Sequence, residues 1–512
     1  MKSKSLFLTA IVFILFSQLL TAQITFQKRY GWTEIDEGKS VLQTFDGGYI
    51  IVGNITRSSG YADIYLIKTD NYGDTLWTKT FGRIGDNTEG FSVDQLSDSG
   101  FIITGFAHAA GNFDLALIRT DNNGDTLWTK LYIGFRNETG YSVHQTFDGG
   151  FIIAGKTNSY GAGEEDFYLV KTDANGDSVW TRTFGGISFD EGQCMIQTTD
   201  SGYIVAGSTY SFGVGANDIY LVKTDASGDT LWTKAIGDSA NNYVSSIKQT
   251  FDGGFIITGI SLGTVSNSYL MKTDSIGNIS WSKTFNRIQP VSVVQTSDSN
   301  FVLVGNANKY ILIVKTNSIG DTLWTKAIGD SSYGAIAQFM SQTSDGGFVI
   351  TGKKNIFDSL YYDVYLLKTD SNGFGSCDEN FYPITISSSQ FQVTFPPTIV
   401  GSGGLVFPYG WDLNIIHGLT YVTPLCTSVD IIDVNPENKF ILFPNPTEGN
   451  FTIKLNAEIK NARAEIYNML GEMVYSTTLN EQQTINNKFP SGIYFVKVTD
   501  SEKQFIEKLI EQ

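Results

Sequence analysis

Short runs of alternating hydrophobic and polar residues recur along most of the chain and are separated by glycine-rich turns. Between residues 90 and 133 the runs read GFSVDQLS, FIITGF, DLALIRTD and TLWTKLYI. Each run has the two-residue period of a β-strand, and the Asp-Gly and Gly-Gly turns between such runs suit tight hairpins because their residues adopt positive φ at little cost. The pattern predicts a four-stranded antiparallel meander.

The meander is repeated seven times. Its marker is Asp-(Gly/Ser)-(Gly/Asn) followed by an aromatic residue, spaced 46 to 52 residues apart and always preceded by Gln three positions earlier. The marker begins at Asp46, Asp98, Asp148, Asp200, Asp252, Asp298 and Asp345. A four-stranded sheet that is apolar on both faces must pack against its neighbours, and a period near 50 is typical of a propeller blade. We therefore expect an all-β protein built on a seven-bladed β-propeller.

The two ends of the repeat array predict how the ring closes. The seventh copy ends at DVYLLKTDSNGFG and lacks a tryptophan-containing fourth strand, whereas FQKRYG (Phe26–Gly31) matches WTKTFG (Trp77–Gly82) of the first copy. The N-terminal segment is thus expected to supply the missing strand and leave no exposed sheet edge. The propeller is expected to span residues 23–375.

The N-terminus and the composition indicate an exported protein. Residues 1–22 carry a basic start, an apolar stretch too short for a comfortable membrane span and a plausible cleavage site before Gln23, so they read as a signal peptide. The formal net charge of −17 argues against nucleic acid as a partner. No membrane span is expected in the mature chain, which is expected to be a monomer.

The stretch DANGDSVW (Asp173–Trp180), which recurs with variations, has three interpretations. Its acidic residues are spaced like the first ligands of an EF-hand, but the loop lacks the required Gly and Glu, so turn chemistry is favoured and no metal or cofactor is expected. The repeat resembles the Trp-docking motif of quinoprotein-type propellers, which implies a packing role for the tryptophan. Its Asp-(Ser/Thr)-aliphatic part is also similar to an O-glycosylation acceptor of some secreted bacterial proteins.

The last 75 residues form a separate unit. Alternating strands and Gly, Pro and Asn turns predict a small β-sandwich over 438–512. The segment resembles the type A C-terminal sorting domain of the type IX secretion system, which implies that its partner is that machinery and that the chain is secreted or displayed on the outer membrane exterior. The residues that carry the resemblance include Pro444, Asn445, Pro446, Gly449, Gly471, Gly492, Tyr494 and Lys508.

Residues 376–437 contain no motif and are expected to be a linker or irregular β region. Cys377 and Cys426 lie in it and are candidates for one disulfide in an oxidising compartment. The third cysteine, Cys194, falls in a repeated strand where other copies have serine, so a buried packing role is expected.

No catalytic motif is present, and residues repeated in all copies are expected to serve the scaffold. Function is expected where copies differ, in the loops between strands two and three and between consecutive copies. Candidate ligand-binding residues there are Tyr61, Tyr160, Tyr210, Phe212, Tyr361, Tyr362, Glu89 and Glu191. We expect a non-enzymatic binding or adhesion module for glycan or protein. The alternative is an extracellular polysaccharide lyase or hydrolase that uses the loop carboxylates.

Overall fold

The computed structural model describes most residues from 23 to 375 and separate stretches from there to 511. Its larger gaps are 1–22, 356–360, 402–413, 416–420, 429–439, 444–449 and 456–461, and gaps of one to four residues occur elsewhere. The predicted signal peptide lies outside the described residues. The described residues contain strands and no helix, hence no helical membrane span. The chain divides into two compact units, Met1–Thr427 and Ser428–Gln512.

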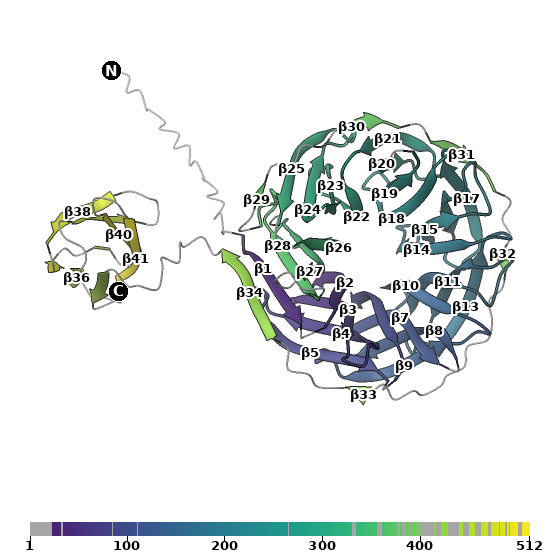
Figure 1. The fold of residues 1–512 in the computed structure, drawn as a ribbon, viewed down its shortest axis with the longest axis horizontal. Coiled ribbons are helices and arrows are strands. Elements are labelled where there is room, and N and C mark those ends of the chain that lie inside the picture. Colours follow the sequence, from purple (N-terminus) through teal and green to yellow (C-terminus); the bar gives the residue numbers. More distant parts are fainter. Residues whose placement is uncertain are drawn as a thin grey trace, which may run out of the picture. The chain divides into compact units, whose positions relative to one another are not determined.

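Seven sheets of the first unit follow one plan, with four antiparallel strands that run from the centre of a propeller-like ring to its outside (Figure 1). We number these sheets as blades 1 to 7. Blade 1 has β2 (Asp36–Gln43), β3 (Tyr49–Thr56), β4 (Ala62–Thr69) and β5 (Thr75–Gly82). Blade 2 has β6 (Thr88–Gln95), β7 (Phe101–Ala109), β8 (Asn112–Thr120) and β9 (Thr126–Tyr132). Blade 3 has β10 (Glu138–Gln145), β11 (Phe151–Thr157), β12 (Asp166–Thr172) and β13 (Ser178–Phe184).

The remaining blades repeat this order. Blade 4 has β14 (Asp190–Gln197), β15 (Tyr203–Thr209), β16 (Asp218–Thr224) and β17 (Thr230–Gly237). Blade 5 has β18 (Asn241–Gln249), β19 (Phe255–Leu262), β20 (Ser266–Thr273) and β21 (Ile279–Phe285). Blade 6 has β22 (Gln289–Gln295), β23 (Phe301–Ala307), β24 (Tyr310–Thr316) and β25 (Thr322–Ile328). Blade 7 has β26 (Ala335–Gln342), β27 (Phe348–Asn355), β28 (Tyr362–Thr369) and β1 (Thr25–Gly31).

Blade 7 joins the two ends of the repeat array. The N-terminal strand β1 pairs antiparallel with β28, with Phe26 opposite Lys368 and Tyr30 opposite Val364. This is the pairing that the sequence comparison of FQKRYG with WTKTFG predicted. Since β1 is far from β28 in the chain, the contact ties the start of the ring to its end.

Short strands from the segment after the last repeat extend six of these sheets at their outer edge (Figure 1). We call this segment, residues 379–428, the belt. Along the chain it meets blades 6, 5, 4, 3, 1 and 7, so it passes around the ring in reverse order. The belt strands are β29 (Glu379–Asn380), β30 (Ile386–Ser388), β31 (Gln392–Thr394), β32 (Val400–Gly401), β33 (Asn414–Ile415) and β34 (Tyr421–Ser428). Cys377 lies outside the described residues and Cys426 lies in β34, so their disulfide stays a prediction.

The recurring tryptophan packs one blade onto the next. The turn glycine of each following blade has positive φ and lies directly on the indole of the preceding blade: a Cβ at Gly176 would be 2.7 Å from the ring of Trp128. At the closure of the ring, Phe26 of β1 occupies the same place against Gly73. Glycine is required at this turn both for its backbone conformation and for the space that the ring needs.

Polar residues repeated in every blade bond within the ring, as the sequence pattern predicted. In the turn before β3, the N–H of Phe45 donates to Oε1 of Gln95 in the next blade at 2.8 Å. Nζ of the buried Lys68 lies 2.8 Å from the carboxylate of the turn residue Asp46. These groups satisfy the hydrogen-bonding needs of the scaffold, so the asymmetric residues are left to carry function.

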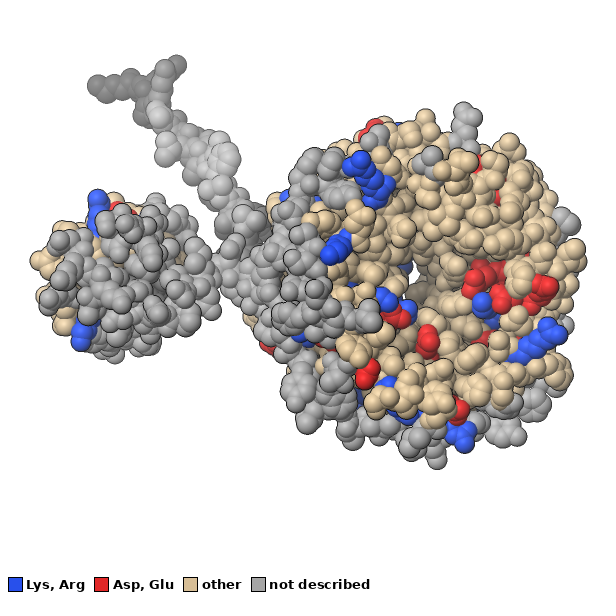
Figure 2. All heavy atoms as spheres, in the orientation of Figure 1, with Lys and Arg blue, Asp and Glu red and all other residues tan. Residues whose placement is uncertain are grey.

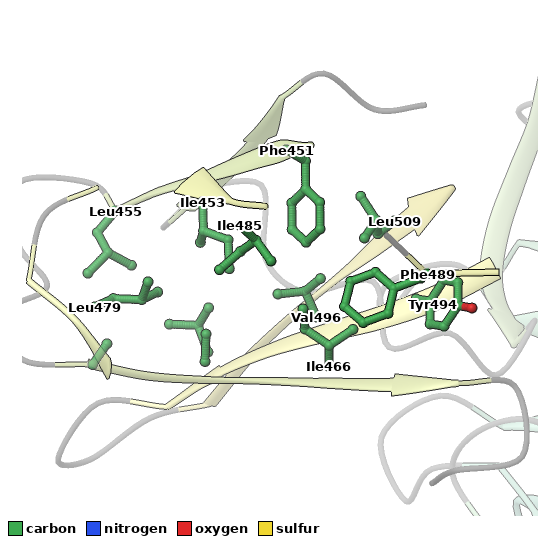
Figure 3. Close-up of a cluster of buried hydrophobic side chains, with 13 residues drawn as sticks. Phe451, Ile453, Leu455, Ile466, Leu479, Ile485, Phe489, Tyr494, Val496 and Leu509 are labelled. Carbon is green, nitrogen blue, oxygen red and sulfur yellow. The ribbon is translucent and has the colours of Figure 1, made fainter. Parts of the chain in front are cut away.

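The second unit consists of a three-stranded and a four-stranded sheet with one shared hydrophobic cluster (Figure 3). Its strands are β35 (Phe440–Phe443), β36 (Phe451–Leu455), β37 (Ala462–Asn468), β38 (Met473–Leu479), β39 (Gln482–Ile485), β40 (Gly492–Thr499) and β41 (Gln504–Glu511). The hydroxyl of Tyr494 in β40 donates to the Pro490 carbonyl at 2.8 Å. Lys508 lies in β41, whereas the predicted motif residues Pro444, Asn445, Pro446, Gly449 and Gly471 lie outside the described residues.

Candidate functional site

The first strands of all seven blades line a central channel with a pocket of about 490 Å³. Every first strand has a β-bulge, an extra residue that redirects a side chain and is common beside functional sites. The bulged residue varies from blade to blade, with glutamine at two of the seven positions, and all seven line the pocket. They are Lys39, Phe91, Tyr141, Gln193, Ser245, Val291 and Gln338. The channel thus has a regular frame and an irregular lining.

A charged network lies at the rim of the channel over blades 3 and 4. Nζ of Lys156 is 3.2 Å from carboxylate oxygens of both Glu165 and Glu191. Burial raises the pKa of Tyr141, and the nearby carboxylates, Glu191 first among them, raise it further. Burial alone would lower the pKa of Lys156, but the two glutamates hold it above its ordinary value. At neutral pH the network therefore presents a phenol O–H and an ammonium group as donors beside carboxylate acceptors.

A second network lies on blades 1, 2 and 7. Glu37 Oε1 is 2.5 Å from Lys39 Nζ, and its other carboxylate oxygen is 2.9 Å from Lys353 Nζ. Burial raises the pKa of Glu37, but the two ammonium groups outweigh burial and leave it below its ordinary value. Burial raises the pKa of Glu89, whose hydrogen-bond contact within the described residues is a long one of 3.5 Å from the Asn54 amide. Two carboxylates at equivalent places in the repeat thus have different proton affinities.

Exposed aromatic side chains stand next to the network of blades 3 and 4. Phe189 and Tyr210 are each 47% exposed, and their ring centroids are 6.4 Å apart in a T-shaped arrangement. The Tyr210 hydroxyl is 3.2 Å from that of Tyr243, which occupies in blade 5 the position of Glu191 in blade 4. Figure 2 shows acidic and basic side chains gathered over the β14 side of the opening. We call Tyr141, Glu191, Lys156, Phe189 and Tyr210 the aromatic rim.

Of the residues predicted from the loops, the structure brings Tyr210 and Glu191 together in the aromatic rim. Glu89 contributes to the electrostatic environment of Tyr141. Tyr160 and Phe212 have supporting roles, because they pack against buried aromatic rings of the blades.

The other three predicted aromatics lie away from this group. Tyr61 and Tyr361 are 39% and 44% exposed on blades 1 and 7. Lys353 Nζ lies 5.2 Å from the centre of the Tyr362 ring.

Sequence reasoning missed Tyr141, Lys156 and the bulged lining residues. The available signal was the position four residues before the invariant Gln, where six kinds of side chain stand in seven copies. Periodicity alone hides this position, because a bulge inserts one residue into the alternation of faces. Only the strand pairing reveals that its side chain enters the channel.

The lower part of the channel carries three more asymmetric polar groups. Nδ1 of His144 is 3.5 Å from Asp94, and burial lowers the pKa of Lys248 beside them. Burial raises the pKa of the Cys194 thiol to about 12, so this cysteine remains protonated and is a poor nucleophile. Its structure agrees with a packing role.

The recurring Asp-x-x-Gly-Asp turn is held by its own hydrogen bonds. Asp173 Oδ1 accepts from the N–H groups of Asn175 and Asp177 at 2.9 Å, and Asp177 pairs with Lys130 at 2.8 Å. The described residues contain no group of three or more His, Cys, Asp or Glu side chains arranged for a metal ion. The threonine hydroxyls of four Asp-Thr-Leu segments are buried, which leaves a glycosyltransferase no access in the folded ring. They belong to Thr75, Thr126, Thr230 and Thr322.

Comparison with solved structures gives weak overall likenesses. The polysaccharide lyase Uly1 aligns with 65% of this chain and 90% of its own, at 10% identity and a TM-score of 0.46. Sqt1 from Chaetomium thermophilum aligns with 67% of this chain and 98% of its own, at 10% identity and a TM-score of 0.37. These values carry no argument about what this chain binds or does. No curated protein matches its sequence.

The C-terminal residues have a clear relative. Residues 441–512 match the family model of the secretion system C-terminal sorting domain. The match confirms the domain that the C-terminal motifs predicted and implies a link to the secretion machinery, with export to the cell surface or secretion. The segment 441–512 is therefore a secretion system C-terminal sorting domain.

Proposed function

We propose that the chain is a seven-bladed β-propeller, exported by the type IX system on a sandwich-type sorting domain, that binds a glycan at the aromatic rim without turning it over. The observation that carries the proposal is the placement of half-exposed Phe189 and Tyr210 beside the Glu191–Lys156 network. An aromatic face stacks on the apolar face of a sugar ring, and carboxylate and ammonium groups bond its hydroxyls.

The electrostatics of the rim support binding over catalysis. A phenol serves as a general base only when its pKa approaches the working pH. Burial and three carboxylates raise the pKa of Tyr141, so it is a donor at neutral pH. The Glu191 carboxylate forms an ion pair with Lys156, which makes it a weaker base for catalysis.

A glycan array probed with the mature full-length chain tests the proposal. We expect binding that falls about five- to thirtyfold in Phe189→Ala and Tyr210→Ala, since a stacked ring is worth about 1–2 kcal/mol. Tyr61→Ala is the matched control, because this tyrosine is also exposed but lies on blade 1. Equal loss in all three variants, or no binding to any glycan, contradicts the proposal.

One observation favours an enzyme as the second candidate. Burial raises the pKa of Glu89, whereas its counterpart Glu37 is held ionised by two lysines. A carboxyl of raised pKa and an ionised carboxyl at one opening are the combination that a polysaccharide hydrolase uses as acid and base. Release of reducing ends from a bound polysaccharide, abolished by Glu89→Gln with binding retained, would establish this function in place of the first.

A further inference from the structure

A second pocket opens between blades 5 and 6, on the side of the variable loops. Its volume is about 480 Å³, within the range of small-molecule sites. Ser266 of β20, Arg287 and Gln289 at the β21–β22 connection, and Asn308 at the β23–β24 turn are among its lining residues. It is separate from the aromatic rim, whose residues belong to blades 3 and 4.

Short loops create this hollow. The turn between β23 and β24 has two residues, 308–309, whereas the loops before β12 and β16 have eight residues each, 158–165 and 210–217. The connection from β21 to β22 has three residues, against five between β13 and β14. The space that longer loops fill in blades 3 and 4 is therefore open here.

The junction has also lost the acidic residues of its neighbours. Between blades 3 and 4 the equivalent positions hold the buried carboxyl groups of Asp166 and Asp190. Between blades 5 and 6 these positions hold Asn267 and Ile288, and no aspartate or glutamate is among the described residues that line the pocket. At the position of Glu191 stands Gln289. Arg287 is therefore the one charged side chain among the described residues that line the cavity, and it gives this lining a positive charge.

Arg287 has no ion-pair or hydrogen-bond partner within the described residues. Five other arginines of the ring have an aspartate partner, whereas Arg136, like Arg287, has none within the described residues; the five are Arg29, Arg57, Arg83, Arg119 and Arg182. Arg287 has a φ of 60°, a left-handed conformation that costs free energy in a residue other than glycine. Asn308 across the same pocket has a φ of 55°. Backbone strain of this kind is concentrated at functional sites.

We propose that this pocket binds a small hydroxyl-bearing anion, such as an acidic sugar, through Arg287. A planar guanidinium matches a carboxylate or sulfate group with two parallel hydrogen bonds. Gln289 and Ser266 are unpaired polar side chains within the described residues and bond the hydroxyls of the ligand. Because the described lining of the pocket has no carboxylate, it does not repel an anion, although the chain has a net charge of −17.

Calorimetric titration of the mature full-length chain with a galacturonate tetramer tests the proposal, alongside its methyl-esterified neutral form and inorganic sulfate. We expect binding of the acidic tetramer that weakens at least about tenfold in Arg287→Asn, an exchange that retains the left-handed backbone. Binding of sulfate alone, lost in the same variant, would make sulfate the recognised group and retain the anion site.

Arg83→Asn is the matched control. Arg83 is an exposed arginine at the equivalent connection between blades 1 and 2, but it pairs with Asp86. Its variant should bind as the native chain does, and Tyr210→Ala should leave this binding unchanged, which separates the pocket from the aromatic rim. Equal affinity for the neutral tetramer, unchanged binding by Arg287→Asn, or equal loss in Arg83→Asn would overturn the proposal.

Discussion

Exchange of one buried carboxyl for an amide should make the ring more stable at neutral pH. Asp166 and Asp190 are 1% and 0% exposed, and each has one carboxylate oxygen with no hydrogen-bond partner in the described part of the chain. They face the same narrow space, because a Cβ at Gly185 would lie 1.9 Å from Asp166 Oδ1 and 2.8 Å from Asp190 Oδ2. Two carboxylates in this position repel each other unless they share a proton.

The magnitude follows from the pKa. Burial raises the pKa of Asp166 to about 6, and Asp190 adds to the shift. Unfolded, the group titrates near 3.9, so the folded chain retains a proton between about pH 4 and 6. Stability contributed by that proton is complete below pH 4 and lost as the pH rises through 6. A difference of about two units corresponds to about 3 kcal/mol in the free energy of unfolding above pH 6.

Asp190→Asn supplies a donor in place of the shared proton. Its amide oxygen still accepts from the Gly186 N–H and the Ser211 hydroxyl, which the Asp190 carboxylate now holds at 2.7 Å. We expect the variant to match the native chain at pH 4 and to exceed it at pH 8, by less than the full Asp166 shift of about 3 kcal/mol, because the burial of Asp166 remains in the variant. Urea unfolding of the mature chain, followed by tryptophan fluorescence across this range, measures the difference.

The next junction supplies the reverse control. There the partner of Asp218 is Asn242, whose Nδ2 lies 3.5 Å from Asp218 Oδ1. Asn242→Asp recreates the carboxyl pair, and we expect it to lose stability above pH 6 only. Burial, Asp190 and Asp166 raise the pKa of Tyr220, so this tyrosine stays protonated in the same pH range. An Asp190→Asn variant that is no more stable than the native chain at pH 8 would refute the reasoning.

Two further predictions concern the packing of the ring. Gly176→Ala should destabilise it by about 2–3 kcal/mol in urea unfolding, because the new methyl group meets the Trp128 ring at 2.7 Å and φ is +76°. Gly149→Ala has a similar φ but open space, so it should cost about 1 kcal/mol, and equal costs would contradict the packing role. Truncation after residue 375 should lower the melting temperature and promote aggregation, because the outer strands lose the belt strands that pair with them. Truncation after residue 437 keeps the belt and should have neither effect. Equal aggregation of the two truncated chains in light scattering would contradict this role of the belt.

Much of the ring was predictable because its determinants are local. Alternation of apolar and polar residues predicts each strand, and the spacing of Asp46 and its six counterparts predicts the repeat. The pairing of Phe26–Gly31 with the last repeat was predictable because the seventh repeat lacks a fourth strand and the N-terminus carries one extra copy of that strand. Such inferences need only the sequence, because repetition supplies the comparison that one copy lacks.

The site was less predictable for a different reason. Tyr210 and Glu191 were identified because they vary between copies, yet the same criterion selected Tyr160 and Phe212, which pack against the blades. Exposure of a loop aromatic depends on the conformation of its loop. That conformation is held by buried carboxyl groups that accept hydrogen bonds from loop N–H groups, as Asp166 and Asp190 do. Lys156 escaped notice because its two glutamate partners are distant in the chain from one another.

The sequence by itself determined the strands, their seven-fold recurrence, the strand that closes the ring and the sorting domain, because each depends on residues that are neighbours in the chain or on a family motif. Tertiary structure alone decided which bulged side chains meet in the channel, where the belt adds strands, and that Arg287 stands in a pocket whose described lining contains no acidic residue. These features arise where separate copies come together, and loop length and charge there act across space rather than along the chain.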